Sequence, residues 1–182
     1  GEYYDAIPTE ELPFYNFAFH ILDGLDGSDM QQVISLTQGW NMVSFNVVPE
    51  ISNLLTNSGN SGILSGLVAL DNLVKMIDES GSTIEYVSFL GEWINGIDDM
   101  ENTEGYYLRV NESDDLIIPG VPLDISNAPF EVPLTLGWNM IGYPGQNSQE
   151  AISLLDQLID EGSLLKVINE SGATIEYVAF LD

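Results

Sequence analysis

Short stretches in which apolar and polar residues alternate predict that this chain is built mainly from β-strands. Two of these stretches, residues 34–48 and 132–143, contain a glycine directly before a Trp-Asn pair, at Gly39 and Gly137. A glycine within a strand pattern is typical of a bulge or a tight turn, so we expect the backbone to bend before each tryptophan. Two further strands are predicted at 105–110 and 115–125.

Helical periodicity is clearest in residues 147–162, which predicts one amphipathic helix there. Asn147 is the expected N-cap, with Glu150 three residues later, and Gly162 is the expected C-cap. The corresponding region near 51–73 is interrupted by glycines, so we expect one or two short helices there. The interrupting glycines are Gly59, Gly62 and Gly66.

The sequence contains an internal repeat. Residues 75–90 match residues 166–181 at 12 of 16 positions with an offset of 91, and both stretches alternate around a Ser-Gly pair, as β-hairpins do. Residues 36–45 match residues 134–143 with an offset of 98. The difference of 98 − 91 = 7 residues lies between the two blocks, where only the first copy has the loose stretch TNSGNSG.

The start of the chain matches the part of the first copy that follows its hairpin. Residues 91–97 read GEWINGI and residues 1–7 read GEYYDAI, so the glycine, the glutamate, an aromatic residue and the final isoleucine coincide. The chain length of 182 is also twice 91. We therefore expect a strand segment at 1–32 equivalent to the tail of a repeat, a first repeat at 33–130, and a second, incomplete repeat at 131–182.

These patterns predict a mainly β protein of the α+β class, with two tandem β-rich repeats of about 91 residues, each with one helix packed on a small sheet or barrel. An N-terminal segment of the same chain or of a neighbouring chain is expected to complete the second repeat. Repeats joined by the short linker SNAPFEV are more naturally strung out than turned back on each other, which favours donation between subunits. Alternatively, the units run 1–90 and 91–182, and each is complete by itself.

A set of short motifs recurs in the two copies. The first copy carries Gly39-Trp40-Asn41, Lys75 to Asp78, Asn95-Gly96-Ile97 and Gly105-Tyr106, and the second carries Gly137-Trp138-Asn139 and Lys166 to Asn169. This order resembles a Gly-Trp-Asn-type repeat of secreted and cell-surface proteins of marine and other environmental bacteria. The second copy departs from the pattern at Asn169 and lacks its tail. The resemblance implies an extracellular, β-rich module and implies no catalytic activity.

The charge balance is extreme, with 29 acidic residues, 3 basic residues and a formal net charge of −26. Such a charge repels phosphate backbones and anionic lipid surfaces, so nucleic acid is excluded as a partner. No apolar run reaches the roughly 18 residues that a membrane span needs, so we expect no membrane insertion. The absence of cysteine excludes disulfides, thiolate nucleophiles and thiolate metal sites.

The sequence carries no catalytic signature. Its one histidine, His20, lies in the apolar stretch FYNFAFHIL, where we expect it to be partly buried. No serine has a nucleophile motif around it, and no glycine loop of the nucleotide-binding type precedes a helix. Carboxylate pairs suited to glycoside hydrolysis are so abundant that finding one means little. We therefore expect a protein that is not an enzyme.

Calcium is the one cofactor that the sequence suggests, because hard cations bind clustered oxygen atoms. The stretch DGLDGSD offers Asp23, Asp26 and Asp29, and IDDMENTE at 97–104 is a second acidic stretch. Neither has the spacing of an EF-type loop. The alternative is that both are solvated acidic turns.

Aromatic residues suggest a binding surface. Trp93, Tyr106 and Tyr107 are candidates for an exposed patch that stacks on sugars, and the alternative is that they pack in the core. Trp40 and Trp138 occupy the same place in both copies, which predicts that they pack in the core, and the alternative is that they form a platform for a ligand.

Lys75 and Lys166 are also equivalent, and they are two of only three basic residues. We expect each to form a local ion pair with a neighbouring carboxylate. The alternative is that such a scarce charge contacts another acidic subunit.

We therefore expect a non-enzymatic structural or adhesive repeat protein at the cell surface or in the extracellular space, assembling head-to-tail with copies of itself into an array or filament. The alternative is a carbohydrate-binding module of a larger secreted protein, with surface glycans as partners. The residues expected to carry assembly are Tyr3, Tyr4, Phe14, Phe17, Phe19 and Phe180.

Overall fold

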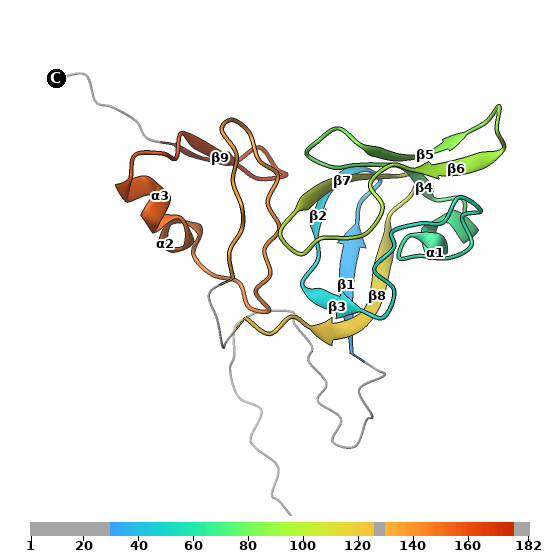
Figure 1. Cartoon of the computed structure of the whole chain (residues 1–182), viewed down its shortest axis with the longest axis horizontal. Coiled ribbons are helices and arrows are strands. Elements are labelled where there is room, and N and C mark those ends of the chain that lie inside the picture. Colours follow the sequence, from blue (N-terminus) through green and yellow to red (C-terminus); the bar gives the residue numbers. More distant parts are fainter. Residues whose placement is uncertain (1–29, 126–129, 177–182) are drawn as a thin grey trace, which may run out of the picture.

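The computed structural model describes residues 30–125 and 130–176. Within these ranges the chain forms ten β-strands and three short α-helices, and the strands make three antiparallel sheets (Figure 1). The mainly β fold class predicted from the sequence is therefore confirmed. Most of this regular structure belongs to the first repeat, and the described part of the second repeat contributes one hairpin and two helices.

Five strands of the first repeat form the larger sheet, in the order β2-β7-β4-β5-β6. The predicted hairpin forms β4 and β5, and the strand predicted at 105–110 is β7 (Gly105–Val110). β7 pairs with β2 on one side and with β4 on the other, so it joins the two halves of the sheet. The other bounds are β2 Gly39–Ser44, β4 Leu73–Ile77, β5 Thr83–Val87 and β6 Glu92–Asn95.

The smaller sheet has the order β1-β8-β3, and its strands run at a steep angle to those of the larger sheet in Figure 1. Its bounds are β1 Gln31–Leu36, β3 Val47–Pro49 and β8 Asp114–Pro122. One short helix, α1 (Ser65–Ala69), forms in the glycine-interrupted region, as predicted. The buried side chains of both sheets and of α1 form one hydrophobic cluster, which includes Leu36, Phe45, Leu67, Met76, Ile84, Leu108 and Ile118.

The alternation of side chains along β7 separates the core from the outer face of the larger sheet. Tyr106, Leu108 and Val110 are buried, whereas Tyr107 and Arg109 are exposed. Successive side chains of a strand point to opposite faces, so this pattern fixes which residues of the neighbouring strands face outward.

Both Gly-Trp-Asn motifs begin with a left-handed glycine. Gly39 has φ 101° and Gly137 has φ 116°, a conformation that residues with a Cβ rarely adopt. The bend predicted before each tryptophan is therefore confirmed.

The helical region of the second repeat forms two short helices, α2 (Ala151–Leu154) and α3 (Asp156–Asp160), where one helix was predicted. The predicted N-cap, Asn147, is wrong, because α2 begins later and the carbonyl of Asn147 instead accepts a hydrogen bond of 2.6 Å from the Tyr143 hydroxyl. Glu150 is the N-cap, and its carboxylate accepts a hydrogen bond from the amide of Ser153. Gly162 follows α3 with φ 66°, as expected of a residue that ends a helix.

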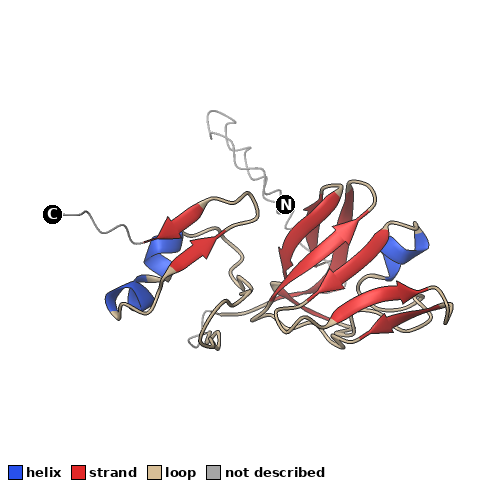
Figure 2. Ribbon diagram, turned by 90° about the horizontal axis from the view of Figure 1, so that it is seen from above, coloured by secondary structure: helices blue, strands red, loops and turns tan. Residues whose placement is uncertain are grey.

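The second repeat has its predicted hairpin, formed by β9 (Lys166–Ile168) and β10 (Thr174–Glu176) and visible beside the two helices in Figure 2. The strand predicted at 132–143 is not a regular strand. It makes one isolated bridge, between Ile141 and Glu104 of the first repeat. A strand needs a paired neighbour over several residues, and the described residues supply one only at this point.

Candidate functional site

A row of side chains crosses the outer face of the larger sheet. The strand register places Trp40 on β2 opposite Arg109 on β7, and Arg109 opposite Lys75 on β4. Lys75 in turn lies opposite Glu85 on β5. The alternation along β7 directs this row away from the core. Two of the three basic residues of the chain thus come together on one surface.

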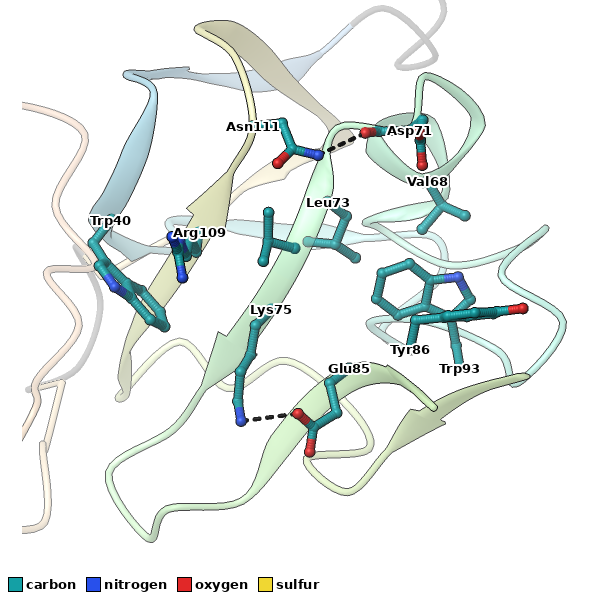
Figure 3. A pocket seen from close by; sticks show the side chains of 11 residues that line it. Trp40, Val68, Asp71, Leu73, Lys75, Glu85, Tyr86, Trp93, Arg109 and Asn111 are labelled. Carbon is teal, nitrogen blue, oxygen red and sulfur yellow. Dashed lines mark hydrogen bonds and ion pairs between the residues drawn. The ribbon is translucent and has the colours of Figure 1, made fainter. Parts of the chain in front are cut away.

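A pocket of ≈ 480 Å³ lies at this row (Figure 3). Trp40 stands at one end and Trp93 with Tyr86 at the other, and Leu73 lies between them. This volume is in the range of sites that hold small molecules, about 300–1,000 Å³. The pocket therefore has aromatic walls, an apolar centre and, at its rim, the charged row of the sheet.

Trp93 is held in place by the loop that precedes α1. Its amide donates a hydrogen bond of 3.0 Å to the carbonyl of Asn57, and its ring packs edge-to-face on Tyr86, with 5.7 Å between the ring centroids. A Cβ at Gly59 would approach Trp93 Cδ1 to 2.8 Å, so only glycine leaves room for the indole. This wall of the pocket is therefore preformed.

The opposite wall combines Trp40 with Arg109. The guanidinium carbon of Arg109 lies 5.8 Å from the centroid of the Trp40 ring, and Tyr107 contacts Trp40 edge-to-face. Within residues 30–125 and 130–176, no carboxylate lies within ion-pair distance of Arg109. In a chain with 29 acidic residues, this arginine thus keeps its N–H donors available for a ligand.

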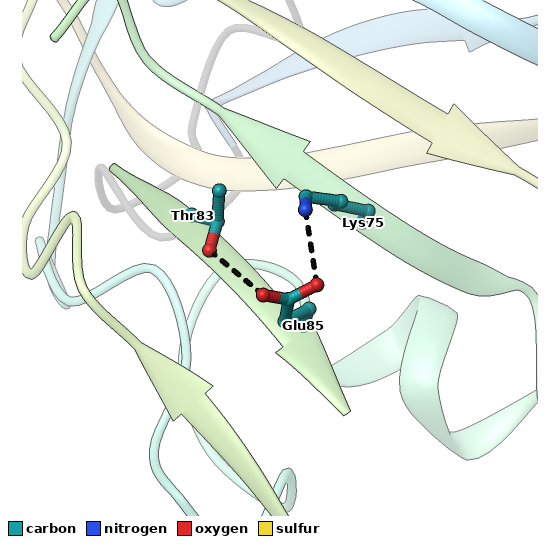
Figure 4. Close-up of polar contacts among 3 residues, drawn as sticks. All are labelled: Lys75, Thr83 and Glu85. Carbon is teal, nitrogen blue, oxygen red and sulfur yellow. Dashed lines mark hydrogen bonds and ion pairs between the residues drawn. The ribbon is translucent and has the colours of Figure 1, made fainter. Parts of the chain in front are cut away.

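Lys75 and Glu85 form an ion pair of 3.0 Å, and the Thr83 hydroxyl donates a second hydrogen bond to Glu85 (Figure 4). The hydrogen bond from Lys75 holds the pKa of Glu85 below its usual range, against an opposing effect of desolvation. The equivalent pair in the second repeat, Lys166 and Glu176, lies at 2.9 Å. The predicted local ion pairs of both lysines are therefore confirmed.

The remaining rim of the pocket offers acceptors. The Asn111 side chain donates a hydrogen bond of 2.9 Å to the carbonyl of Asp71, which orients its own Oδ1 oxygen. In the part of the chain that the structure describes, neither this oxygen nor the Asp71 carboxylate accepts a hydrogen bond. With Lys75 and Arg109 balanced by Asp71 and Glu85, the charges lining the pocket sum to zero.

The binding surface predicted from Trp93, Tyr106 and Tyr107 forms only in part. Tyr106 was placed there wrongly, because it is 1% exposed and packs on Phe45 in the core. Trp93 lines the pocket, and Tyr107 lies behind Trp40. Arg109 was not predicted as a site residue, although it is one of only three basic residues in the chain and this scarcity could have identified it.

The prediction that Trp40 and Trp138 pack in the core is also wrong. Trp40 is 45% exposed and Trp138 is 72% exposed. On β2 the buried neighbour is Asn41, so the alternation of the strand turns Trp40 outward.

Apolar residues of the second repeat lie uncovered where their counterparts are buried. Leu36 is 3% exposed and its counterpart Leu134 is 45% exposed, and Val43 at 5% corresponds to Ile141 at 46%. In the first repeat Leu36 pairs with β8 and Val43 pairs with β7, and residues 130–176 contain no counterpart of either strand. The second repeat is therefore incomplete within the described chain.

Several predicted residues lie outside the described ranges. They are the calcium candidates Asp23, Asp26 and Asp29, the assembly candidates Tyr3, Tyr4, Phe14, Phe17, Phe19 and Phe180, and His20. Among the residues that are described, no group of three or more His, Asp or Glu is placed to hold a metal ion. Across the same residues, no helix has the length and apolar character needed to span a membrane.

Comparison with known proteins yields no relative. No family model matches this chain, and no curated protein or solved structure matches it either. The resemblance to the Gly-Trp-Asn-type repeat therefore stays a prediction.

Proposed function

We propose that this protein is a non-enzymatic adhesive module of an extracellular protein, and that its first repeat binds a neutral saccharide in the pocket between Trp40 and Trp93. The observation that carries this proposal is the pairing of aromatic walls with hydrogen-bonding groups at the rim. An aromatic ring offers a flat apolar surface on which the C–H face of a sugar ring can pack. A few well-placed polar groups then fix the orientation of such a ligand.

The polar groups of the pocket suit hydroxyl groups, which both donate and accept hydrogen bonds. Arg109 and Lys75 supply donors, and Asp71, Glu85 and Asn111 supply acceptors. Because two cations face two carboxylates, the pocket favours a ligand without net charge. The formal charge of −26 also repels acidic polysaccharides, so neutral saccharides are the better fit.

Titration calorimetry with a panel of neutral and acidic oligosaccharides tests this function. We expect a neutral saccharide to bind, and Trp40→Ala and Arg109→Gln each to weaken binding at least about tenfold. Trp138→Ala is the matched control, because Trp138 is equivalent to Trp40 and lies in the second repeat, and it should leave binding unchanged. Trp93→Ala should abolish binding as well, measured alongside a melting curve because Trp93 also packs against the core.

Two outcomes would overturn the proposal. One is that no saccharide of the panel binds, and the other is that Trp138→Ala weakens binding as much as Trp40→Ala. Turnover of substrates in a panel of glycosidase, protease and esterase assays would contradict the non-enzymatic role.

Head-to-tail assembly into an array or filament is the alternative function. Its support is the uncovered apolar surface of the second repeat, exemplified by Leu134 and Ile141. It requires a neighbouring chain to complete that repeat, so the identity of the completing segment decides between the two functions.

A further inference from the structure

The second repeat has a position for a strand that no described residue occupies. In the first repeat, β7 lies between β2 and β4. Their counterparts are residues 137–142 and β9, and within residues 130–176 β9 pairs only with β10. We call the place between these two segments the β7 position of the second repeat.

Only alternate residues of the stretch 137–142 direct their backbone amides at this position. On β2 the amide of Met42 points away from β7, because it donates to the Glu170 carboxylate. Successive residues of a strand direct their amides to opposite edges, so Asn41 and Val43 face β7. The second repeat follows the same alternation, since Met140, the counterpart of Met42, has its amide and carbonyl engaged by the first repeat. The amide of Ile141 therefore faces the β7 position.

The two repeats contact each other through equivalent residues. The amide of Met42 donates a hydrogen bond of 3.1 Å to Glu170, and the amide of Met140 donates one of 3.1 Å to Glu79. Met42 and Met140 are equivalent by the offset of 98, and Glu79 and Glu170 by the offset of 91. Reciprocal contacts of this kind define a twofold axis between the repeats.

Contacts close to this axis agree with it. The side chain of Asn46 donates to the carbonyl of Gly145, and the side chain of Gln146 donates to the carbonyl of Asn46. The amide of Tyr143 donates to the Ser44 hydroxyl. Segments 44–48 and 142–146 occupy equivalent places by the offset of 98, and equivalent segments meet each other only at a twofold axis.

A twofold relation closes after two units. In the first repeat, β8 leads through residues 123–130 into the second repeat. Rotation about the axis exchanges the two repeats. The strand of the second repeat that corresponds to β8 must therefore be followed in the chain by β1 of the first repeat. The residues directly before Met30, where the described chain begins, occupy that place in the sequence. Continuation of the same relation to a third repeat would place it on top of the first, so the relation does not build an open filament.

We propose that residues 1–29 of the same chain complete the second repeat, with a strand at 15–21 in the β7 position. Tyr15, Phe17, Phe19 and Ile21 alternate with Asn16, Ala18 and His20, which gives this stretch one strongly apolar face. The buried face of β7 has the same character, with Tyr106, Leu108 and Val110. The segment comes within two residues of the required length, with 29 residues against the 122 − 92 + 1 = 31 residues that span β6 to β8.

Completion within the chain has an entropic advantage over donation from a neighbour. A tethered segment meets its site at an effective concentration in the millimolar range for a short flexible connection. Exchange between two chains would reproduce the same contacts as a swapped dimer and would lose that advantage. Completion within one chain requires the two repeats to face each other. The tandem order in the sequence gave no reason to expect this arrangement, and the twofold contacts provide it.

Hydrogen exchange on the full chain tests the proposal. In the unaltered protein we expect the amides of β9 and of Ile141 to be protected, and Phe17→Asp to return them to the exchange rate of an unstructured peptide. Asn16→Asp is the matched control, because it adds the same charge on the opposite face of the strand, and it should keep the protection. The β4–β5 hairpin serves as an internal reference that neither variant changes.

Light scattering across a roughly hundred-fold dilution identifies the donor. A monomer at every concentration, with β9 protected throughout, is the expected result. If the amides of β9 lose their protection when a dimer or polymer dissociates on dilution, a neighbouring chain supplies the strand and the proposal is overturned. An unprotected β9 in the unaltered protein, or equal effects of Phe17→Asp and Asn16→Asp, would show that residues 15–21 do not fill the β7 position.

Discussion

Asn41 and Thr37 close the turn that precedes β2 through a reciprocal pair of hydrogen bonds. The Asn41 carboxamide accepts from the amide of Thr37 at 2.8 Å and donates to its carbonyl at 2.9 Å. Asn139 and Thr135 repeat both bonds at the same distances in the second repeat. The asparagine thus supplies the structural part of the Gly-Trp-Asn motif, and the tryptophan between it and the glycine is left facing outward.

Replacement of this asparagine should be costly only where it is buried. Asn41→Ala leaves the Thr37 amide without its partner, which costs about 1–3 kcal/mol of unfolding free energy. Asn139→Ala makes the same change in the second repeat, and it should cost a similar amount if residues 1–29 fill the β7 position and bury Asn139 as β7 buries Asn41. Urea unfolding followed by tryptophan fluorescence measures both. A loss below about 0.5 kcal/mol for Asn41→Ala would contradict this account of the motif.

Tyr106 anchors the loop before β7 by its hydroxyl group. The hydroxyl accepts from the Glu101 amide at 2.9 Å and hydrogen-bonds to Glu104, and burial raises the pKa of Tyr106 above its ordinary value. Tyr106→Phe should lower the unfolding free energy by about 1–3 kcal/mol, because the Glu101 amide loses its partner. Tyr107→Phe is the control on the exposed face of the same strand and should change it by less than about 0.5 kcal/mol. Chemical denaturation distinguishes the two results.

The adjacent tyrosines illustrate what the sequence could and could not predict. The strand 105–110 was predicted with its correct bounds, because alternation and flanking turns are local signals. The alternation of the strand also indicated which tyrosine is buried, because Leu108 and Val110 share the face of Tyr106 whereas Arg109 shares that of Tyr107, and this signal was not used. Trp40 could not be assigned in this way, because its polar neighbour Asn41 takes the buried side.

The pocket and the twofold axis depend on residues that are distant in the sequence. Arg109 reaches Trp40 and Lys75 only because β7 inserts between β2 and β4. The repeat offsets showed that Met42 and Met140 are equivalent. No local sequence pattern indicated that each donates its amide to a glutamate of the opposite repeat. Topology sets such pairings, and it is the part of the fold that periodicity does not encode.

The Lys75–Glu85 ion pair should contribute little to stability because both side chains are partly exposed. We expect Lys75→Met to lower the unfolding free energy by less than about 1 kcal/mol at neutral pH. The pKa of Glu85 is lowered in the folded state, so the stability from this pair is present above the unfolded pKa and is lost as the pH falls through the folded pKa. Melting curves from pH 7 downward should therefore converge for the variant and the unaltered protein. Lys166→Met, at the equivalent and similarly exposed pair, should likewise lower the unfolding free energy by less than about 1 kcal/mol at neutral pH.

The net charge of −26 should make stability depend on salt. Self-repulsion destabilises a compact, highly charged chain, and 1 M salt reduces the screening length to about 3 Å. We expect the melting temperature to rise steadily with sodium chloride up to about 1 M. A flat profile would contradict this expectation.

A calcium site at Asp23, Asp26 and Asp29 would add an effect beyond screening. Millimolar calcium should then raise the melting temperature more than sodium chloride of equal ionic strength, and the triple change to asparagine should remove the excess. If calcium still raises the melting temperature of the triple variant more than sodium chloride does, the ion binds elsewhere on the acidic surface.

Glu104 should destabilise the folded protein at neutral pH. Burial raises its pKa, and the carboxylates of Asp78, Glu79 and Glu101 add to this effect, whereas the hydrogen bond from Tyr106 opposes it. The folded state therefore binds the proton more tightly than the unfolded state, so this residue favours folding most below its unfolded pKa and progressively less as the pH rises through its folded pKa. Glu104→Gln removes the charge and should raise the unfolding free energy at pH 7, with a gain that shrinks as the pH approaches 4.5, the ordinary pKa of the group. Glu112→Gln is the control, because that carboxylate is exposed and is not among the charges that act on Glu104, and urea titrations at several pH values compare the two. A gain for Glu104→Gln that is independent of pH would show that packing, and not the charge of Glu104, sets the stability of this loop.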